Sequence, residues 1–243
     1  MTLKLISTSN YEELSQKAAE EIISRIKRNP SLNLGLATGS TPTGLYQELI
    51  RDHEQNQTSY KDINTFNLDE YIGIPKKDHN SYHYFMCEHL FEHIDIPLDQ
   101  THIPDGTAKD LDKECRRYEQ FIEEQGGIDL QILGIGQNGH IGFNEPGTPF
   151  DSRTHIINLA ESTRKANSRF FESLEDVPKQ AITMGIASIM DSKEIFMLVS
   201  GTSKAEALAR LMNGDVSEHF PASILQNHRN VTIFADKEAT ALL

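Results

Sequence analysis

A histidine and a carboxylate in one glycine-rich stretch are the first feature of this 243-residue sequence that could do chemistry. His140 and Glu145 lie in G-I-G-Q-N-G-H-I-G-F-N-E-P, which follows an apolar run, and Asn138 precedes the histidine by two residues. Imidazole titrates nearest to neutral pH, and a carboxylate on its second nitrogen fixes the tautomer and raises the basicity. We therefore predict an acid/base pair of His140 and Glu145. The alternative interpretation is a loop in which Glu145 only accepts hydrogen bonds from backbone amides.

The same stretch contains the spacing G-x-G-x-x-G, beginning at Gly134, which is typical of dinucleotide-binding loops. Such a loop must lead into a helix that packs on the strand, with an acidic residue about 20 positions later for the ribose. Here Gly142 and Pro146 would break that helix, and position 158 is an asparagine. We therefore predict that no dinucleotide cofactor binds.

A second glycine-containing turn, Gly35-Leu-Ala-Thr-Gly-Ser-Thr-Pro42, stands between an expected strand and an expected helix. Backbone amides, the hydroxyls of Thr38, Ser40 and Thr41, the flexible Gly39 and the positive end of the helix together form an anion site. Thr41 followed by Pro42 predicts the cap and first turn of that helix. The turn predicts a phosphate site, with an ordinary capped turn as the alternative.

Two adjacent carboxylates end the third stretch, Phe66-Asn-Leu-Asp-Glu-Tyr71. Successive strand residues point to opposite faces, so at most one of Asp69 and Glu70 is expected to face a cleft. A partly desolvated Asp69 there could act as a base towards a C–H proton. A solvated turn is the alternative interpretation.

His83, Cys87, His89 and His93 suggest a metal cluster by composition. At about 100° per residue on a helix, His83 and Cys87 share a face, whereas the other two lie about 240° away from His83. One ion cannot collect all four side chains from a straight helix, so we predict no metal site. Cys87 and Cys115 are the only cysteines and suit a reducing compartment.

The elements that must position these stretches alternate between short apolar runs and longer amphipathic ones, which predicts an open, mostly parallel α/β sheet with helices on both faces. In the first helix, Leu14, Ala18, Ile22 and Ile26 repeat every fourth residue after a capping Asn10, and Pro30 follows its end. A second helix is expected from Thr41 through Ile50. The expected strands are 3–6, 32–36, 63–68, 130–135, 195–199 and 231–235, and the further helices are 81–91, 110–123, 163–171 and 203–212.

We find no repeat, linker or low-complexity tract, so residues 1–243 are expected to form a single catalytic domain. The segment 146–179 is polar and the least regular, and we expect it to be a mobile cover rather than core. A formal charge of −13 argues against nucleic acid and anionic membranes. No apolar run reaches the roughly 18 residues that a membrane span needs, which predicts a cytoplasmic protein.

Taken together, the stretches resemble the glucosamine-6-phosphate deaminase family, which converts glucosamine 6-phosphate into fructose 6-phosphate and ammonia. The resemblance runs from Leu34 to about Lys204 in five ordered blocks: L-A-T-G-S-T-P, F-N-L-D-E-Y, G-I-G-Q-N-G-H-I-G-F-N-E-P, T-R-K-A-N-S-R-F-F and S-G-T-S-K-A. It implies a Rossmann-like fold and an isomerase and hydrolase that needs no metal or other cofactor.

The resemblance also implies roles for individual residues. His140 would open the sugar ring, with Asn138 and Glu145 orienting it, and Asp69 would move the proton from C2 to C1. The phosphate would bind at Thr38, Gly39, Ser40 and Thr41, with positive charge from Arg169 and Lys204.

Two departures from the family pattern matter. Some members carry aspartate where Asn138 stands, which leaves the role of this side chain open. Regulated hexameric members have a longer C-terminus and a basic cluster that binds an N-acetylated sugar phosphate, whereas this chain reads Arg153-Thr-His-Ile-Ile157 there. We therefore expect no such activation and a monomer or small homo-oligomer.

Two rival functions remain at this stage. A 6-phosphogluconolactonase-like hydrolase shares a similar glycine and histidine loop but needs no proton-abstracting Asp69. A non-catalytic sugar-phosphate sensor would normally carry a helix-turn-helix module, for which this chain has no spare length.

Overall fold

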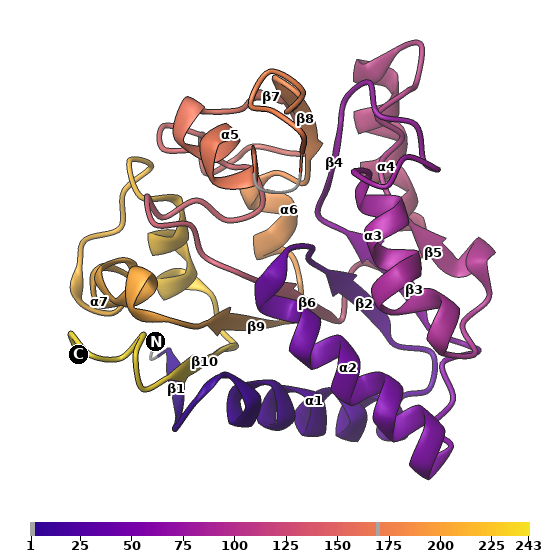
Figure 1. Ribbon diagram of the computed structural model, residues 1–243, viewed down its shortest axis with the longest axis vertical. Coiled ribbons are helices and arrows are strands. Elements are labelled where there is room, and N and C mark those ends of the chain that lie inside the picture. The colour runs from indigo at the N-terminus through magenta and orange to yellow at the C-terminus, as the bar shows by residue number, and fades with distance from the viewer. Residues whose placement is uncertain (1–2, 169–170) are drawn as a thin grey trace.

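The computed structural model describes residues 3–168 and 171–243, and its centre is a seven-stranded sheet (Figure 1). The strand order is β1 (Lys4–Thr8), β10 (Val231–Asp236), β9 (Glu194–Val199), β6 (Leu130–Leu133), β2 (Asn33–Leu36), β3 (Asn64–Asn67) and β5 (Thr101–His102). Every neighbouring pair is parallel. The six predicted strands are confirmed, and the two-residue β5 was not predicted.

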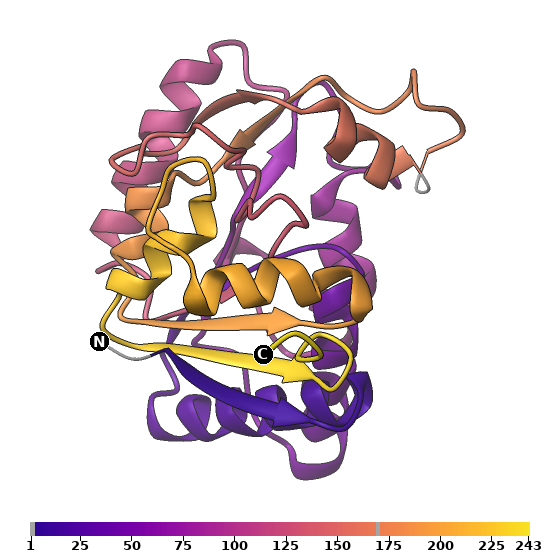
Figure 2. The same cartoon turned by 90° about the vertical axis from the view of Figure 1, so that its left-hand side faces the viewer.

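Helices cover both faces of this sheet, as expected. On one face, α1 (Tyr11–Arg28), α2 (Ser40–Asn56) and α3 (Tyr82–His89) pack on an apolar cluster that contains Leu34 and Ile132. On the other face, α4 (Leu111–Glu124), α6 (Ile186–Met190) and α7 (Ala205–Asn213) pack on a second cluster that contains Leu133 and Ile195. Ile132 and Leu133 serve opposite clusters because neighbouring strand residues alternate sides. Figure 2 shows β9, β10 and β1 side by side between α7 and α1.

The first helix follows its sequence pattern closely. The Asn10 side chain accepts a hydrogen bond from the Glu13 amide at 2.9 Å, and Leu14, Ala18, Ile22 and Ile26 are buried. The helix ends at Arg28, before Pro30, as predicted. No helix among the described residues is long and apolar enough to cross a membrane.

The second helix begins one residue earlier than predicted, so the assignment of Thr41 as its cap was wrong. It starts at Ser40, and Gly39 occupies the cap position with φ of 98°, a conformation that favours glycine. Pro42 lies in the first turn, as predicted. The helix continues past the predicted end at Ile50 to Asn56. Its last turns are polar, so the apolar pattern behind the prediction stops before the helix does.

The expected helix 110–123 is confirmed by α4, whereas the other three helical predictions are correct in position but not in length. The expected helix 81–91 divides into α3 and the 3₁₀ turn η1 (Phe91–His93), and the expected helix 203–212 into η4 (Thr202–Lys204) and α7. Helix α5 (Glu161–Asn167) begins before the expected residue 163 and ends earlier than expected. Further 3₁₀ turns are η2 (Leu98–Gln100) and η5 (Pro221–Asn227).

A second, antiparallel sheet was not predicted. It consists of β4 (Asp69–Tyr71), β8 (Gln180–Thr183) and β7 (His155–Asn158), with Asp69 and His155 both opposite Thr183. The segment 146–179 is therefore more regular than expected, because it contains β7 and α5 and buries Leu159 and Val177. Figure 1 shows these elements grouped at one end of the molecule, away from α1.

The cap of α1 gives a test of local stability. Replacing Asn10 with alanine removes the acceptor for the Glu13 amide, so the free energy of unfolding should fall by about 1 kcal/mol, whereas Asn10→Ser should retain most of it. Urea unfolding followed by circular dichroism measures both variants. An alanine variant as stable as the wild type would contradict the role of the cap.

Candidate active site

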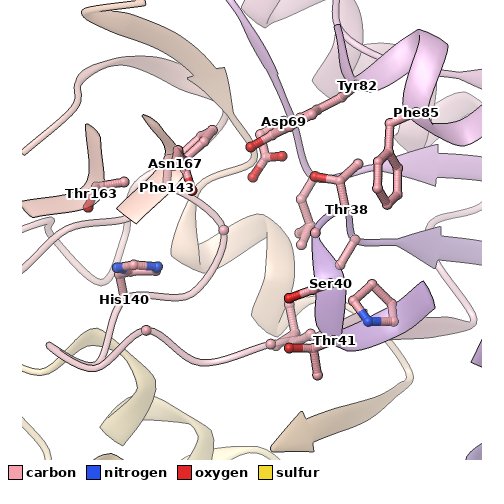
Figure 3. A pocket seen from close by; sticks show the side chains of 18 of the residues that line it. Thr38, Ser40, Thr41, Asp69, Tyr82, Phe85, His140, Phe143, Thr163 and Asn167 are labelled. Carbon is pink, nitrogen blue, oxygen red and sulfur yellow. The ribbon is translucent and has the colours of Figure 1, made fainter. Parts of the chain in front are cut away.

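A cavity of about 1150 Å³ opens at the carboxyl ends of β2, β3, β6 and β9. Predicted site residues gather in its wall from four separate stretches: Thr38, Gly39, Ser40, Thr41, Asp69, Asn138, His140 and Lys204. Glu145 lies behind this wall, where it is 8% exposed. Arg169 lies outside the described residues. Figure 3 shows His140 on one side of the cavity, Thr38 on the other and Asp69 between them.

The glycines after β6 shape a turn that seats the His140 ring. The Gly136 amide donates to the His140 carbonyl at 2.9 Å, and a Cβ at Gly136 would lie 2.3 Å from the imidazole. Gly139 has φ of 86° and donates to the Gly136 carbonyl at 3.0 Å. The chain continues as turns up to Pro146 without forming a helix, as predicted. These glycines therefore hold a histidine rather than open a nucleotide-binding helix.

His140 and Glu145 are neighbours, as predicted, but without a direct hydrogen bond. His140 Nδ1 lies 3.8 Å from Glu145 Oε2 and has no hydrogen-bond partner among the described residues. Asn138 bridges the two residues, since its amide donates to Glu145 Oε2 at 2.8 Å and its oxygen accepts from the His140 amide at 3.2 Å. Glu145 thus binds a side chain rather than only loop amides.

The pKa of His140 lies below its usual value. Burial is the main cause because it disfavours the imidazolium, while Glu145 acts in the opposite direction and Lys204 adds to the lowering. The neutral imidazole is therefore favoured near neutral pH, which is the form that accepts a proton.

Asp69 faces the cavity, and Glu70 points away from it, which confirms that at most one of the pair faces the cleft. Burial, followed by the charge of Glu70, raises the pKa of Asp69 to about 8. No side-chain or backbone donor among the described residues hydrogen-bonds its carboxylate. Glu70 instead accepts from the amides of Tyr71, Tyr82 and His83 at 2.8 to 3.0 Å, although burial still raises its pKa to about 7.

The loop of Thr38 to Thr41 places the start of α2 at the cavity. The first amides of a helix have no partner within it, and the cap residue of α2, Gly39, has no side chain to accept from them, so the start of this helix is suited to an anion. Tyr11 fixes this turn from outside, because its hydroxyl donates to the Ser40 and Thr41 carbonyls at 3.0 Å. Lys204 Nζ donates to the Ile135 carbonyl at 2.8 Å, which holds its positive charge at the cavity.

Sequence reasoning missed four site residues, which are Tyr71, Tyr82, Thr163 and Asn167. Tyr82 hydrogen-bonds Thr38 and donates to the Tyr71 hydroxyl at 3.3 Å, and Asn167 donates to the same hydroxyl at 2.9 Å. Thr163 donates from α5 to Glu145 Oε1. The only sequence signal for Thr163 and Asn167 was their four-residue spacing, which places both on one helix face.

Among the described residues, no three histidine, cysteine or acidic side chains form a group that could hold a metal ion. His83 Nδ1 and Cys87 Sγ lie 3.8 Å apart, so they share a helix face as their spacing predicts.

A parallel sheet whose carboxyl edge carries a helix start for an anion, beside a histidine and a buried aspartate, defines an α/β enzyme for small anionic substrates. The chain belongs to the family described as glucosamine-6-phosphate isomerases/6-phosphogluconolactonase, whose model matches residues 8–234.

Similar proteins support the assignment of the chain to this family. A glucosamine-6-phosphate deaminase of Geobacillus sp. (strain WCH70) is 59% identical over 241 residues, which cover 99% of this chain and 96% of the relative. Glucosamine-6-phosphate deaminase 1 of Bacillus subtilis (strain 168) is 52% identical, with 99% of both chains covered.

Solved structures extend the comparison. A monomeric glucosamine-6-phosphate deaminase superposes with a TM-score of 0.98 at 52% identity, covering 99% of this chain and all of the other. The 6-phosphogluconolactonase from Trypanosoma brucei gives a TM-score of 0.77 at 20% identity, covering 100% of this chain and 99% of the other. The second likeness shows a common fold only.

The raised pKa of Asp69 predicts that this carboxylate destabilises the fold at neutral and higher pH. The folded pKa of about 8 exceeds the usual aspartate pKa of 3.8, so wild-type stability is lost as pH rises from about 4 through 8. Asp69→Asn cannot ionise, and near pH 8 it should be more stable than the wild type by on the order of 2 kcal/mol, with little difference near pH 4. Urea unfolding across this pH range measures the difference.

The exposed Asp99→Asn variant is the matched control, and its stability should follow the wild type at every pH. An Asp69→Asn variant that gains nothing between pH 4 and 8 would show that the cavity does not desolvate Asp69.

Proposed function

We propose that this enzyme isomerises and deaminates glucosamine 6-phosphate to give fructose 6-phosphate and ammonia. The relatives that are 52% to 59% identical over almost their whole length carry the name of this activity. The observation that carries the proposal is that Asp69 and His140 face one cavity, beside a helix start suited to phosphate. The reaction needs these three elements: two proton-transfer groups and an anchor for the anionic end of the substrate.

The phosphate binds at the loop of Thr38, Gly39, Ser40 and Thr41. Hydroxyls and helix amides there supply donors, and Lys204, which lines the same cavity, supplies positive charge. Arg169 completes the site in this proposal, on the basis of its place in the family motif, because a guanidinium binds phosphate oxygens in pairs. The phosphate fixes the sugar so that its reacting carbons lie between His140 and Asp69.

His140 opens the sugar ring. The neutral imidazole accepts the proton of the anomeric hydroxyl and returns a proton to the ring oxygen as the bond between C1 and that oxygen breaks. Glu145 and Asn138 orient the ring through the contacts described above. The lowered pKa of His140 keeps the acceptor form available.

Asp69 then moves a proton between neighbouring carbons. Its carboxylate takes the proton from C2 as the C1 oxygen gains a proton, which gives an enolamine. Return of the C2 proton to C1, with loss of a proton from the amine nitrogen, leaves an imine at C2. Water adds to this imine, and ammonia leaves to give the ketose. A cationic amine on the substrate would favour the ionised Asp69 and offset the burial that raises its pKa to about 8.

The family description names isomerases, so the term hydrolase applies to this enzyme only through its water-consuming last step. No step of the proposed reaction is assigned to a metal or a nicotinamide. A cytoplasmic location, a single catalytic domain and a mobile cover at 146–179 remain predictions.

Two alternatives are weaker. Lactone hydrolysis breaks no C–H bond and gives no role to a buried, donor-free Asp69, and the solved lactonases are about 20% identical. A sensor needs no proton-transfer group, so the pairing of Asp69 and His140 in one cavity would be without purpose.

Asp69→Asn separates these functions. In a coupled assay for fructose 6-phosphate and ammonium, turnover should fall by about 10² or more because the amide cannot accept the C2 proton. Calorimetry should still detect binding of glucosamine 6-phosphate, since the phosphate loop is intact.

Asp99→Asn should retain wild-type turnover and so controls for the loss of a negative charge. Retention of more than about a tenth of the turnover by Asp69→Asn would remove this residue from the mechanism. Wild-type hydrolysis of 6-phosphogluconolactone without ammonia release would instead support the lactonase.

The contacts of Arg153 support unregulated kinetics. Its guanidinium contacts Asp191 at 2.5 Å and lies 3.8 Å from Glu119. Two carboxylates already interact with this cation, which leaves less of its charge for an anionic effector. We expect a hyperbolic rate curve and a monomer or small homo-oligomer. Added N-acetylglucosamine 6-phosphate should leave the curve unchanged, and a sigmoidal curve that it makes hyperbolic would refute this expectation. Steady-state kinetics with and without this compound provide the test.

A further inference from the structure

Helix α5 contributes a buried hydroxyl to the acid/base side of the cavity. Thr163 is 6% exposed, lines the cavity and donates its hydroxyl proton to Glu145 Oε1. Figure 3 shows Thr163 beside His140, on the side of the cavity opposite Thr38. Nothing in the proposed reaction requires a hydroxyl at this place, so its contact with Glu145 calls for a separate explanation.

The two oxygens of Glu145 have different partners. Oε1 accepts from Thr163, whereas Oε2 accepts from Asn138 at 2.8 Å and faces His140 Nδ1 at 3.8 Å. Both donors are neutral, and they come from different elements, α5 and the turn after β6. They fix the carboxylate plane, and this plane leaves Nδ1 just beyond hydrogen-bond reach.

We propose that Thr163 is a positioning residue that controls the protonation of His140 by competing with it for Glu145. This inference rests on the proposed function, since it assigns Thr163 a part in ring opening. While Thr163 donates to Oε1, the carboxylate has little need of a proton from the imidazole. The ring then remains neutral and ready to accept the proton of the anomeric hydroxyl.

Loss of the hydroxyl would leave Oε1 buried without a donor, which is costly for a carboxylate. His140 Nδ1 has no hydrogen-bond partner among the described residues and lies 3.8 Å from Oε2 of the same carboxylate, so it is a group that could replace the lost donor. The charged groups that act on His140 are Glu145, which raises its pKa, and Lys204, which lowers it. A Glu145 with one donor fewer would attract the imidazolium more strongly, so the pKa of His140 would rise.

Thr163→Val tests this competition, because valine keeps the shape and removes the hydroxyl. The acidic limb of the kcat/KM profile should move to higher pH, and kcat near pH 6 should fall about tenfold, with a smaller loss near pH 9. KM should change less than about twofold, because the phosphate loop is untouched. NMR of labelled histidine should show His140 titrating at higher pH than in the wild type, without any substrate.

Two variants separate positioning from general packing. Thr163→Ser retains the hydroxyl and should restore the wild-type pH profile. Thr154→Val removes a buried hydroxyl that donates to Glu119, so it is a matched loss away from His140 and should leave the acidic limb unchanged.

An unchanged acidic limb and histidine titration in Thr163→Val would overturn the proposal, as would an equal loss of activity at every pH. The same would follow if Thr163→Ser behaved like the valine variant. A wild-type protein without deaminase activity would refute the proposed function, whereas the histidine titration would still decide whether Thr163 competes for Glu145.

Discussion

The burial of Asp69, without a hydrogen-bond donor in the part of the chain that the structure describes, is the constraint on which the site depends. The side chain is 6% exposed, and its pKa of about 8 records the cost of ionising it there. The neighbouring carboxylate of Glu70 differs, because it accepts hydrogen bonds from two amides at the start of α3 and from the Tyr71 amide in β4. Because strand residues alternate sides, the two adjacent acids differ in role. Glu70 is held by hydrogen bonds, whereas Asp69 is available to act as a base. A carboxylate with strong donors would be a poorer base, so the missing donors at Asp69 suit proton abstraction.

A second constraint is electrostatic, since the proposed substrate is an anion and the chain has a formal charge of −13. The overall field opposes a sugar phosphate, and the attraction must come from groups within a few ångströms. Candidate groups lie at one edge of the fold: the start of α2, the hydroxyls of Thr38, Ser40 and Thr41, and Lys204 in η4, which follows β9. These groups come from strands β2 and β9, which are separated by β6 in the sheet, so only the parallel topology brings them together.

Sequence patterns predicted the central sheet because six of its strands are apolar runs bounded by turns. They failed at β4, β7 and β8, which are short, and only the pairing of Asp69 and His155 with Thr183 makes them strands. Motifs located the loops of His140, Asp69 and Thr38, since glycines and charged residues mark them. They missed Thr163 and Tyr82, because a threonine or tyrosine on a helix carries no chemical signature until its partners are known. The cap of α2 was misplaced for a related reason: a glycine with positive φ competed with a threonine that matched the usual rule.

The small antiparallel sheet explains how the two acid/base groups keep their separation. Thr183 lies opposite Asp69 in β8, and its hydroxyl accepts a hydrogen bond from the Phe143 amide, three residues after His140. A Cβ at Gly142 would lie only 3.0 Å from this hydroxyl, and the φ of 56° at this position also favours glycine. Met184 continues the link, because its amide donates to the Leu68 carbonyl and its carbonyl accepts from Asn144. The position of Asp69 relative to His140 is thus set by β8, while the central sheet positions the loop that is proposed to bind the phosphate. A fold shared with lactonases at 20% identity can therefore serve different chemistry, since substitutions around β8 can alter the proton-transfer groups without disturbing the anion site.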